Sequence, residues 1–314
     1  MQPVFLLSLP RSGSTLLQRL LAARQDGAIV TRSEPWIVLP FCQGFYEEEA
    51  ITAYQQDLSH AAIDEFLSEQ GMNRIQLMRG CLDSIYARYA TGSARYFLDK
   101  TPRYIFATEC LMKLYPDARY IVLWRNPFAC LTSQSNTWKQ GQFYLGNMMN
   151  DYHEGLLGLL SVAENEAIKK IEVRYEDLVE NISEEVNRIF EFLDLDHDDE
   201  VSTNYKNIQL KGEFGDPLRD KKYQSVTNAS LSTWEEFFST PLRYFWAKKY
   251  LDWLGQDRLA RMGYDQSEID SRLSIRRYSG FRYDGVPMLK EYIMKRINKS
   301  ALGAYRATLK RLYR

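Results

Sequence analysis

The chain has 314 residues, of which 45% are hydrophobic and 26% charged, and its formal net charge at pH 7 is −1. This composition is ordinary for a globular protein, and the length is ample for one large α/β domain with a substantial core. No stretch approaches the apolar length of a membrane span, and a predicted strand at the very N-terminus leads us to expect no signal peptide.

The small net charge conceals an uneven distribution of charge along the chain. Residues 276–314 contain 11 Lys and Arg against 2 Asp and Glu, so residues 1–275 hold 29 basic and 39 acidic residues. We therefore predict one domain over residues 1–275, with a helical insertion at about 41–91, and a separate basic tail over residues 276–314.

The stretch from Val4 to Arg24 combines two hydrophobic periods. Residues 4–9 form an almost unbroken apolar run, which is typical of a strand buried on both faces of a sheet. Leucines then recur at helical spacing, which predicts a helix with one packed face (Leu16, Leu17, Leu20 and Leu21). The turn between strand and helix reads PRSGST, from Pro10 to Thr15.

This turn has the features of an anion-binding loop. Where a strand turns sharply into a helix, the loop amides and the first helix amides point at one spot, and the helix dipole favours negative charge there. Arg11 adds a fixed positive charge, and Ser12, Ser14 and Thr15 add hydroxyl groups around Gly13. An ordinary turn with a polar cap is the alternative. Because Ser14 stands where a Walker A loop has its Lys, we expect a monophosphate-type group bound without metal.

A carboxylate follows the second predicted strand, residues 28–32. Pro35 stops this strand and holds Glu34 in extended geometry at its carboxyl end, where open α/β sheets bind ligands. A solvated loop carboxylate is the alternative. Helical periodicity then runs through residues 50–71 and 72–91, and this insertion could form one wall of an acceptor pocket.

A lysine follows the third predicted strand, residues 94–98. Lys100 lies at its carboxyl end, and Pro102 suits the first turn of the helix that comes next. A lone Lys is normally a solvated charge. Three charged groups at successive strand ends, Arg11, Glu34 and Lys100, instead indicate a common site at one edge of the sheet.

An arginine follows the clearest buried strand, residues 118–124. Arg125 could bind an anion with two parallel hydrogen bonds, and Ser133, two turns into the helix opened by Pro127, could add a hydroxyl. The alternative is that Arg125 pairs with a neighbouring carboxylate.

The second half of the chain is read from its periodicity. We expect a long helix over residues 143–169, in which His153 is a minor candidate for a base and more readily a structural residue. The remaining expected elements are a strand at 171–174 leading into Tyr175, a helix ending near 193, a polar loop at 197–228 that could cover a ligand, and helices over 231–262.

The four cysteines show no metal-binding or redox spacing. They are Cys42, Cys81, Cys110 and Cys130, mostly in apolar surroundings. We therefore expect reduced, buried thiols rather than disulfides, and by default a cytoplasmic protein.

Five motifs in this order resemble the PAPS-dependent sulfotransferases, closest to the branch shared by bacterial enzymes and tyrosylprotein sulfotransferases. PAPS is 3′-phosphoadenosine 5′-phosphosulfate, and the motifs are PRSGST, SEP, DKTPRY, WRNPFACLTS and VRYEDLV. The resemblance covers roughly residues 4–262. It implies an α/β, P-loop-like three-layer fold with a central parallel sheet flanked by helices. It also implies transfer of a sulfuryl group from PAPS to an acceptor hydroxyl by in-line displacement.

The resemblance also implies roles for individual residues. The cofactor-binding residues would be Arg11, Ser12, Gly13, Ser14 and Thr15 around the 5′-phosphosulfate, Arg125 and Ser133 on the 3′-phosphate, and Tyr175 at a further contact. The catalytic residues would be Glu34 as general base, with Lys100 and Arg11 stabilising the charge that grows on the leaving group; no metal is required. No histidine lies in the rim loops, unlike in the cytosolic aryl and steroid enzymes.

The basic tail has the pattern of an amphipathic helix. From Leu289 to Leu309 apolar residues recur every four positions among basic ones, which predicts a basic amphipathic helix that could rest on an anionic membrane or dock on the acidic body. We expect a hydroxyl-bearing acceptor (a glycan, lipid or small metabolite) and no nucleic acid, in the cytoplasm or on the inner face of the membrane. The rivals are a P-loop-type phosphotransferase and a non-catalytic protein that binds nucleotide or membrane.

Overall fold

The computed structural model describes most of the chain: residues 1–43, 56–89, 92–143, 145–146, 148–212, 215, 231–277 and 284. The chain forms two compact units. The first consists of Met1–Arg125 and Asp151–Asn228, and the second of Asn126–Asn150 and Ala229–Arg314. The predicted boundary between residues 275 and 276 stays a prediction, because most of the tail, including its expected amphipathic helix, lies outside the described residues.

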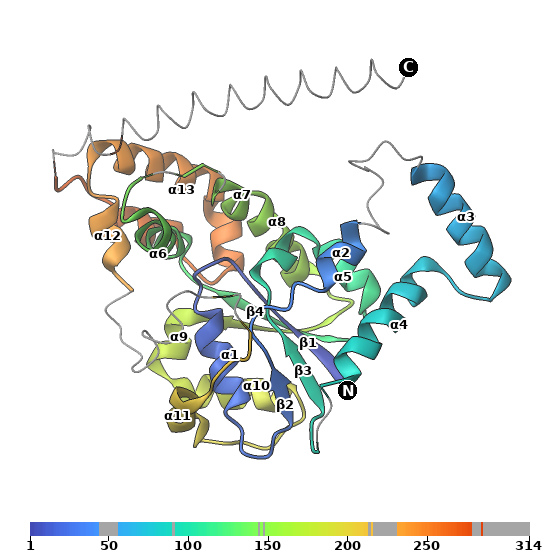
Figure 1. The fold of residues 1–314 in the computed structure, drawn as a ribbon. Coiled ribbons are helices and arrows are strands. Elements are labelled where there is room, and N and C mark those ends of the chain that lie inside the picture. Colours follow the sequence, from blue (N-terminus) through green and yellow to red (C-terminus); the bar gives the residue numbers. More distant parts are fainter. Residues whose placement is uncertain are drawn as a thin grey trace, which may run out of the picture. The chain divides into compact units, whose positions relative to one another are not determined.

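A parallel sheet forms the centre of the first unit (Figure 1). Its strand order is β2-β3-β1-β4-β5, and every neighbouring pair runs parallel. The strands are β1 (Gln2–Ser8), β2 (Ile29–Thr31), β3 (Tyr96–Asp99), β4 (Arg119–Trp124) and β5 (Lys169–Arg174). Phe5, Leu6 and Leu7 of β1 are fully buried, as expected of a central strand covered on both faces. The predicted central parallel sheet is confirmed.

Helices cover both faces of this sheet, which makes three layers (Figure 1). One layer contains α1 (Ser14–Ala22), α9 (Tyr175–Glu180), α10 (Ile182–Phe192) and α11 (Val201–Asn204). The other contains α4 (Arg74–Ala87), the 3₁₀ helix η2 (Pro102–Phe106), α5 (Thr108–Leu114) and α8 (Glu154–Glu164). Because all the strands are parallel, the loops that follow them come out at one edge, and the site is built there.

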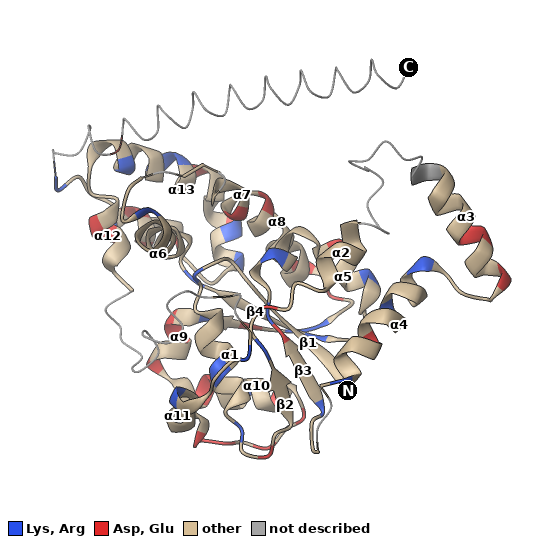
Figure 2. Ribbon diagram, in the orientation of Figure 1, with Lys and Arg blue, Asp and Glu red and all other residues tan. Residues whose placement is uncertain are grey.

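Helix α2 (Val38–Phe41) ends where the predicted insertion begins, and the described residues of the insertion contain two helices, α3 (Gln56–Glu69) and α4. The side chain of Asn73 caps α4 in a reciprocal arrangement with Gln76, which explains why this helix begins after the turn at Gly71. Helix α3 contains Asp and Glu residues but no Lys or Arg (Figure 2). Asp64 of α3 forms an ion pair with Arg74 of α4.

Three predicted elements differ from the structure. The expected helix over 143–169 is instead α7 (Met148–Tyr152) and α8, because His153 has a non-helical backbone (φ −109°, ψ −82°), and Lys169 already belongs to β5. Ala107 interrupts the helix expected after Pro102, leaving η2 and α5. The loop expected at 197–228 contains α11 and a 3₁₀ turn, η3 (Tyr205–Asn207), which pack on α1.

The expectation of reduced thiols is wrong for two of the four cysteines. Cys42, at the end of α2, and Cys110, in α5, form a disulfide with a Cα–Cα distance of 5.9 Å. Cys130 is a buried free thiol and Cys81 an exposed one. The error arose because the two bonded residues are 68 positions apart and meet only in the folded chain.

An aromatic cluster holds the second unit together. Its described helices are α6 (Pro127–Lys139), α12 (Thr233–Phe237), α13 (Pro241–Arg261) and α14 (Gln266–Arg272), the last of which the sequence did not indicate. Phe128 of α6 contacts the rings of Trp234, Phe238 and Tyr250. Throughout the described part of the chain, no helix is both long and apolar enough to cross a membrane.

Candidate active site

The loop after β1 turns through two left-handed residues. Arg11 has φ +68° and Gly13 has φ +91°, and Gly13 is the N-cap of α1. The carbonyl of Gly13 accepts from the amides of Leu16 and Leu17, which starts the helix. The first amides of an α-helix have no partner within the helix, so those of α1 face the loop together with its dipole. This is the strand–loop–helix expected of an anion site.

Gly13 also lies against an aromatic ring. A Cβ built on Gly13 would lie 2.4 Å from two ring carbons of Tyr175, the first residue of α9. The guanidinium of Arg125 stacks on the same ring at 4.3 Å, and its Nη1 donates to the carbonyl of Arg11 at 2.8 Å. Tyr175 and Arg125 therefore support the loop from the ends of β5 and β4.

Lys100 joins the loop to the carboxylate after β2. Its Nζ donates to Glu34 Oε1 at 2.9 Å and lies 3.4 Å from Thr15 Oγ1. The side chain of Lys100 is 3% exposed and that of Glu34 is 12% exposed. The structure thus brings together Lys100 and Glu34, which the sequence placed at two separate strand ends, and Thr15, which the sequence placed in the first loop.

The second oxygen of Glu34 has a partner that the sequence did not suggest. The indole Nε1 of Trp36 donates to Glu34 Oε2 at 3.2 Å. Trp36 has φ +59°, an uncommon backbone conformation for a bulky residue, and its side chain is 41% exposed. An exposed aromatic ring therefore lies directly beside the carboxylate.

Neighbouring segments hold the two residues that precede Glu34. Gln18 of α1 donates to the carbonyl of Arg32 at 2.8 Å, and the amide of Ser33 donates to the carbonyl of Lys211 at 2.9 Å. A Cβ on Gly215 would lie 2.8 Å from Ser33 Oγ. The described part of the predicted covering loop therefore runs beside Glu34.

Asp99, the last residue of β3, is a second feature that sequence reasoning missed. Its side chain is fully buried, and burial raises its pKa from 3.8 to about 7, against the opposing effect of hydroxyl donors and the Lys100 charge. A charged residue ending an otherwise apolar strand was the only signal for it in the sequence.

Two further candidates are Ser133 and His153. Ser133 is in α6, which belongs to the second unit, so its contact with a 3′-phosphate stays a prediction. His153 is the N-cap residue of α8, and partial burial lowers its pKa.

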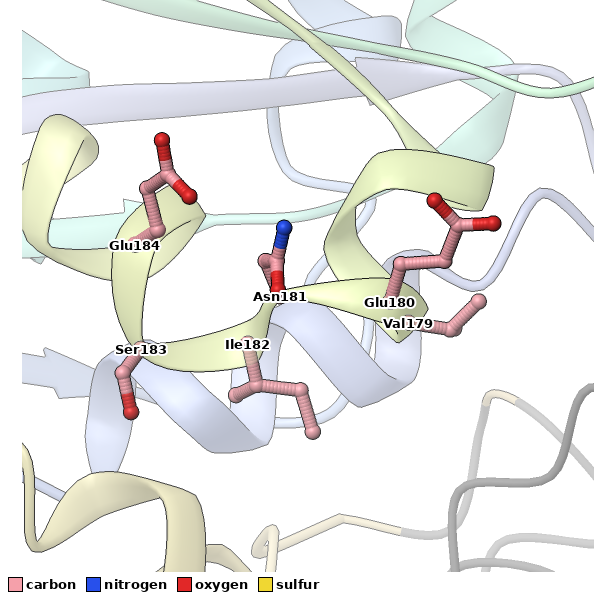
Figure 3. A pocket seen from close by; sticks show the side chains of 6 residues that line it. All are labelled: Val179, Glu180, Asn181, Ile182, Ser183 and Glu184. Carbon is pink, nitrogen blue, oxygen red and sulfur yellow. The ribbon is translucent and has the colours of Figure 1, made fainter.

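A pocket at the junction of α9 and α10 is a different feature (Figure 3). Its lining contains two carboxylates, Glu180 and Glu184, which would repel an anion. In the described residues, no group of three or more His, Cys, Asp or Glu side chains could hold a metal ion.

The fold and this edge of the sheet define a class of protein: a three-layer α/β protein whose strand–loop–helix can hold an anion beside a paired carboxylate and ammonium. Residues 3–199 match the profile of the sulfotransferase family. The chain belongs to this family.

Two kinds of relative agree with the assignment. The chain is 32% identical over 286 residues to nodulation protein NoeE of Sinorhizobium fredii (strain NBRC 101917 / NGR234), covering 84% of this chain and 66%, just under two thirds, of that protein. Among solved structures, the sulfotransferase domain from the Synechococcus PCC 7002 olefin synthase superposes with a TM-score of 0.50 at 21% identity, covering 74% of this chain and 86% of that one. The second match concerns the fold alone.

Proposed function

We propose that this protein transfers a sulfuryl group from PAPS to an acceptor hydroxyl, with Glu34 as the general base. The observation that carries the proposal is the position of Lys100, whose ammonium lies between Glu34 and Thr15 of the anion-binding loop. A proton acceptor and a charge-stabilising cation are therefore adjacent, which is what in-line displacement requires.

The residues present suit the donor's anionic groups. Arg11, the first amides of α1 and the hydroxyls of Ser12, Ser14 and Thr15 would hold the 5′-phosphosulfate. Arg125 would hold the 3′-phosphate, and the ring of Tyr175 would keep the Arg125 guanidinium in place. The role of Ser133 on the same phosphate rests on the family resemblance alone. The donor supplies the sulfuryl group, and this chain supplies binding, orientation and charge.

The chemistry then follows from the positions of the side chains. Glu34 takes the proton of the acceptor hydroxyl as its oxygen bonds to sulfur, while the bond from sulfur to the 5′-phosphate oxygen breaks. Lys100 and Arg11 stabilise the negative charge that grows on that oxygen, which leaves as adenosine 3′,5′-bisphosphate. The residues assigned to these steps need no metal ion.

The proposal leaves the acceptor at the level of a hydroxyl-bearing molecule, such as a glycan, a lipid or a small metabolite. Expected cytoplasmic residence rested on reduced thiols, and the bond between Cys42 and Cys110 removes that ground. The membrane contact proposed for the basic tail is independent of the reaction.

The test is Glu34→Gln, which keeps the shape of the side chain and its bond to Lys100 but removes the base. We expect turnover with PAPS to fall by about 10²–10⁴-fold, with the affinity for adenosine 3′,5′-bisphosphate retained in calorimetry. Glu166→Gln, at a carboxylate whose side chain is 90% exposed, is the matched control. Undiminished turnover in Glu34→Gln would refute the assignment of the base.

The phosphotransferase rival makes a different prediction. It requires metal-dependent transfer from a nucleoside triphosphate, whereas the proposal requires turnover with PAPS that persists in EDTA. Binding of the bisphosphate without any turnover over a panel of hydroxyl acceptors would instead favour the non-catalytic rival.

A further inference from the structure

Asp99 is a buried carboxylate that the proposed reaction does not use. It ends β3 immediately before Lys100 and is fully buried. Tyr86 and Tyr104 donate to its Oδ2 at 2.7 and 3.1 Å, and Thr101 Oγ1 lies 3.5 Å from its Oδ1. A buried carboxylate costs free energy even when it is hydrogen-bonded, so its presence here calls for a reason beyond packing.

Two of these three hydroxyls also bind the segment that carries Glu34. Thr101 Oγ1 accepts from the amide of Trp36 at 3.3 Å, and the hydroxyl of Tyr104 accepts from the amide of Val38 at 3.4 Å. A hydroxyl that gives its proton to a carboxylate presents lone pairs to an amide, and such chains strengthen each other. Asp99 therefore sets the direction in which both hydroxyls accept.

The segment held in this way needs support. Trp36 is in a left-handed conformation, which is strained for a bulky residue and persists only where the surroundings hold it. Its indole donates to Glu34, so the position of its backbone decides where that donor points. A chain of hydrogen bonds thus runs from Asp99 through Thr101 and Trp36 to Glu34.

We infer that Asp99 is a positioning residue: through Thr101 and Tyr104 it holds the Glu34–Val38 segment so that the Glu34 carboxylate faces Lys100. The inference rests on the proposed sulfuryl transfer for its catalytic meaning. Tyr86, in α4, donates to the same oxygen of Asp99 as Tyr104 does. Unlike the hydroxyl of Tyr104, that of Tyr86 accepts no hydrogen bond from the Glu34–Val38 segment in the described residues.

That difference supplies a matched pair of variants. Tyr86 and Tyr104 are both fully buried, both donate to Asp99 Oδ2, and each loses one hydroxyl on replacement by Phe. We expect Tyr104→Phe to lower kcat by about 10–10²-fold with an unchanged KM for PAPS, since misplacing a reacting group by about 1 Å costs about 10²-fold. Tyr86→Phe should lower kcat much less, although both variants lose thermal stability to a similar degree.

Thr101 and Asp99 give a second comparison. Thr101→Val should lower kcat, and Thr101→Ser, which keeps the hydroxyl, should restore it; packing alone predicts no such rescue. Asp99→Asn keeps the shape but loses one acceptor oxygen, and we expect a fall in kcat like that of Tyr104→Phe.

Amide hydrogen exchange tests the positioning without reference to activity. Exchange in a peptide spanning residues 34–41 should be faster in Tyr104→Phe and Asp99→Asn than in wild type, and unchanged in Tyr86→Phe. Equal effects of Tyr86→Phe and Tyr104→Phe on both kcat and exchange, or no effect of either, would overturn the inference. If the wild type does not transfer sulfuryl groups, the proposed function fails, while the exchange result alone still decides whether Asp99 holds the segment.

Discussion

Lys100 Nζ lies 2.9 Å from Glu34 Oε1 and 3.4 Å from Thr15 Oγ1, so one buried ammonium joins the segments that follow three neighbouring strands. We predict that Lys100→Met lowers kcat by about 10²–10³-fold, because loss of one preorganised donor at the growing charge typically costs that much. Steady-state kinetics with PAPS measures the change. Lys113→Met, at a lysine of α5 whose side chain is 54% exposed, should stay within about twofold of wild type.

Gly13→Ala should abolish donor binding. The new Cβ would lie 2.4 Å from the ring of Tyr175, and the backbone there has φ +91°. Calorimetry with adenosine 3′,5′-bisphosphate measures the loss. Gly71→Ala separates the steric clash from the backbone strain of a positive φ. Gly71 also has a positive φ, +66°, but no atom lies within 4 Å of its Cβ position. The control should lose about 1 kcal/mol of stability and bind normally; if it binds equally poorly, the steric explanation is wrong.

Asp99 should make stability depend on pH. Its pKa is about 7 in the folded chain against 3.8 as the ordinary value, so its protonated form stabilises the fold below pH 4, and that stabilisation is lost as pH rises towards 7. The free energy of unfolding of wild type minus that of Asp99→Asn should therefore fall by a few kcal/mol between about pH 4 and pH 8, at about 1.4 kcal/mol per pKa unit. Denaturant titrations at several pH values measure this difference.

Asp117→Asn is the opposite-sign control for that experiment. A hydrogen bond from Arg79 lowers the pKa of Asp117, so its contribution is present above the ordinary carboxyl pKa and is lost as pH falls. If the difference in unfolding free energy between wild type and Asp99→Asn did not change with pH, folding would not shift the pKa of Asp99, and the prediction would be wrong.

The disulfide between Cys42 and Cys110 should be found in the purified protein. Mass spectrometry under non-reducing conditions should recover the two peptides linked, with Cys81 alkylated because it is exposed. The double variant Cys42→Ser/Cys110→Ser should lose about 2–4 kcal/mol of stability, since the bond closes a long loop. Complete alkylation of all four cysteines without reductant would contradict the bond.

The basic tail should bind anionic membranes. We predict that the full chain co-sediments with phosphatidylserine vesicles and that a chain ending at residue 285 does not, with the difference shrinking as salt is raised. This end point retains Asp284, which is buried in an ion pair with Arg243. Equal binding by both chains would show that the tail is not the membrane contact.

Local patterns were sufficient for the strands and for the first loop. The apolar runs before Pro10, Lys100 and Arg125 each end within a residue or two of the last residue of the observed strand. Short runs that are apolar at every position suit a strand buried on both faces better than other structures. The same reasoning failed over residues 143–169. The leucine stripe there is continuous, but the backbone breaks at His153, and hydrophobic spacing does not record a break of that kind.

By itself, the sequence determined that charged groups follow the strands and that a strand–loop–helix precedes them, because periodicity and turn chemistry act over a few residues. Only the tertiary structure decided that Lys100 lies between Glu34 and Thr15. The strand order β2-β3-β1 places the end of β3 between Glu34, after β2, and Thr15, after β1. The fold likewise decided which hydroxyls bind Asp99 and which cysteine pairs with Cys42. Strand order and long-range packing depend on the whole chain, so a local sequence pattern does not reveal them.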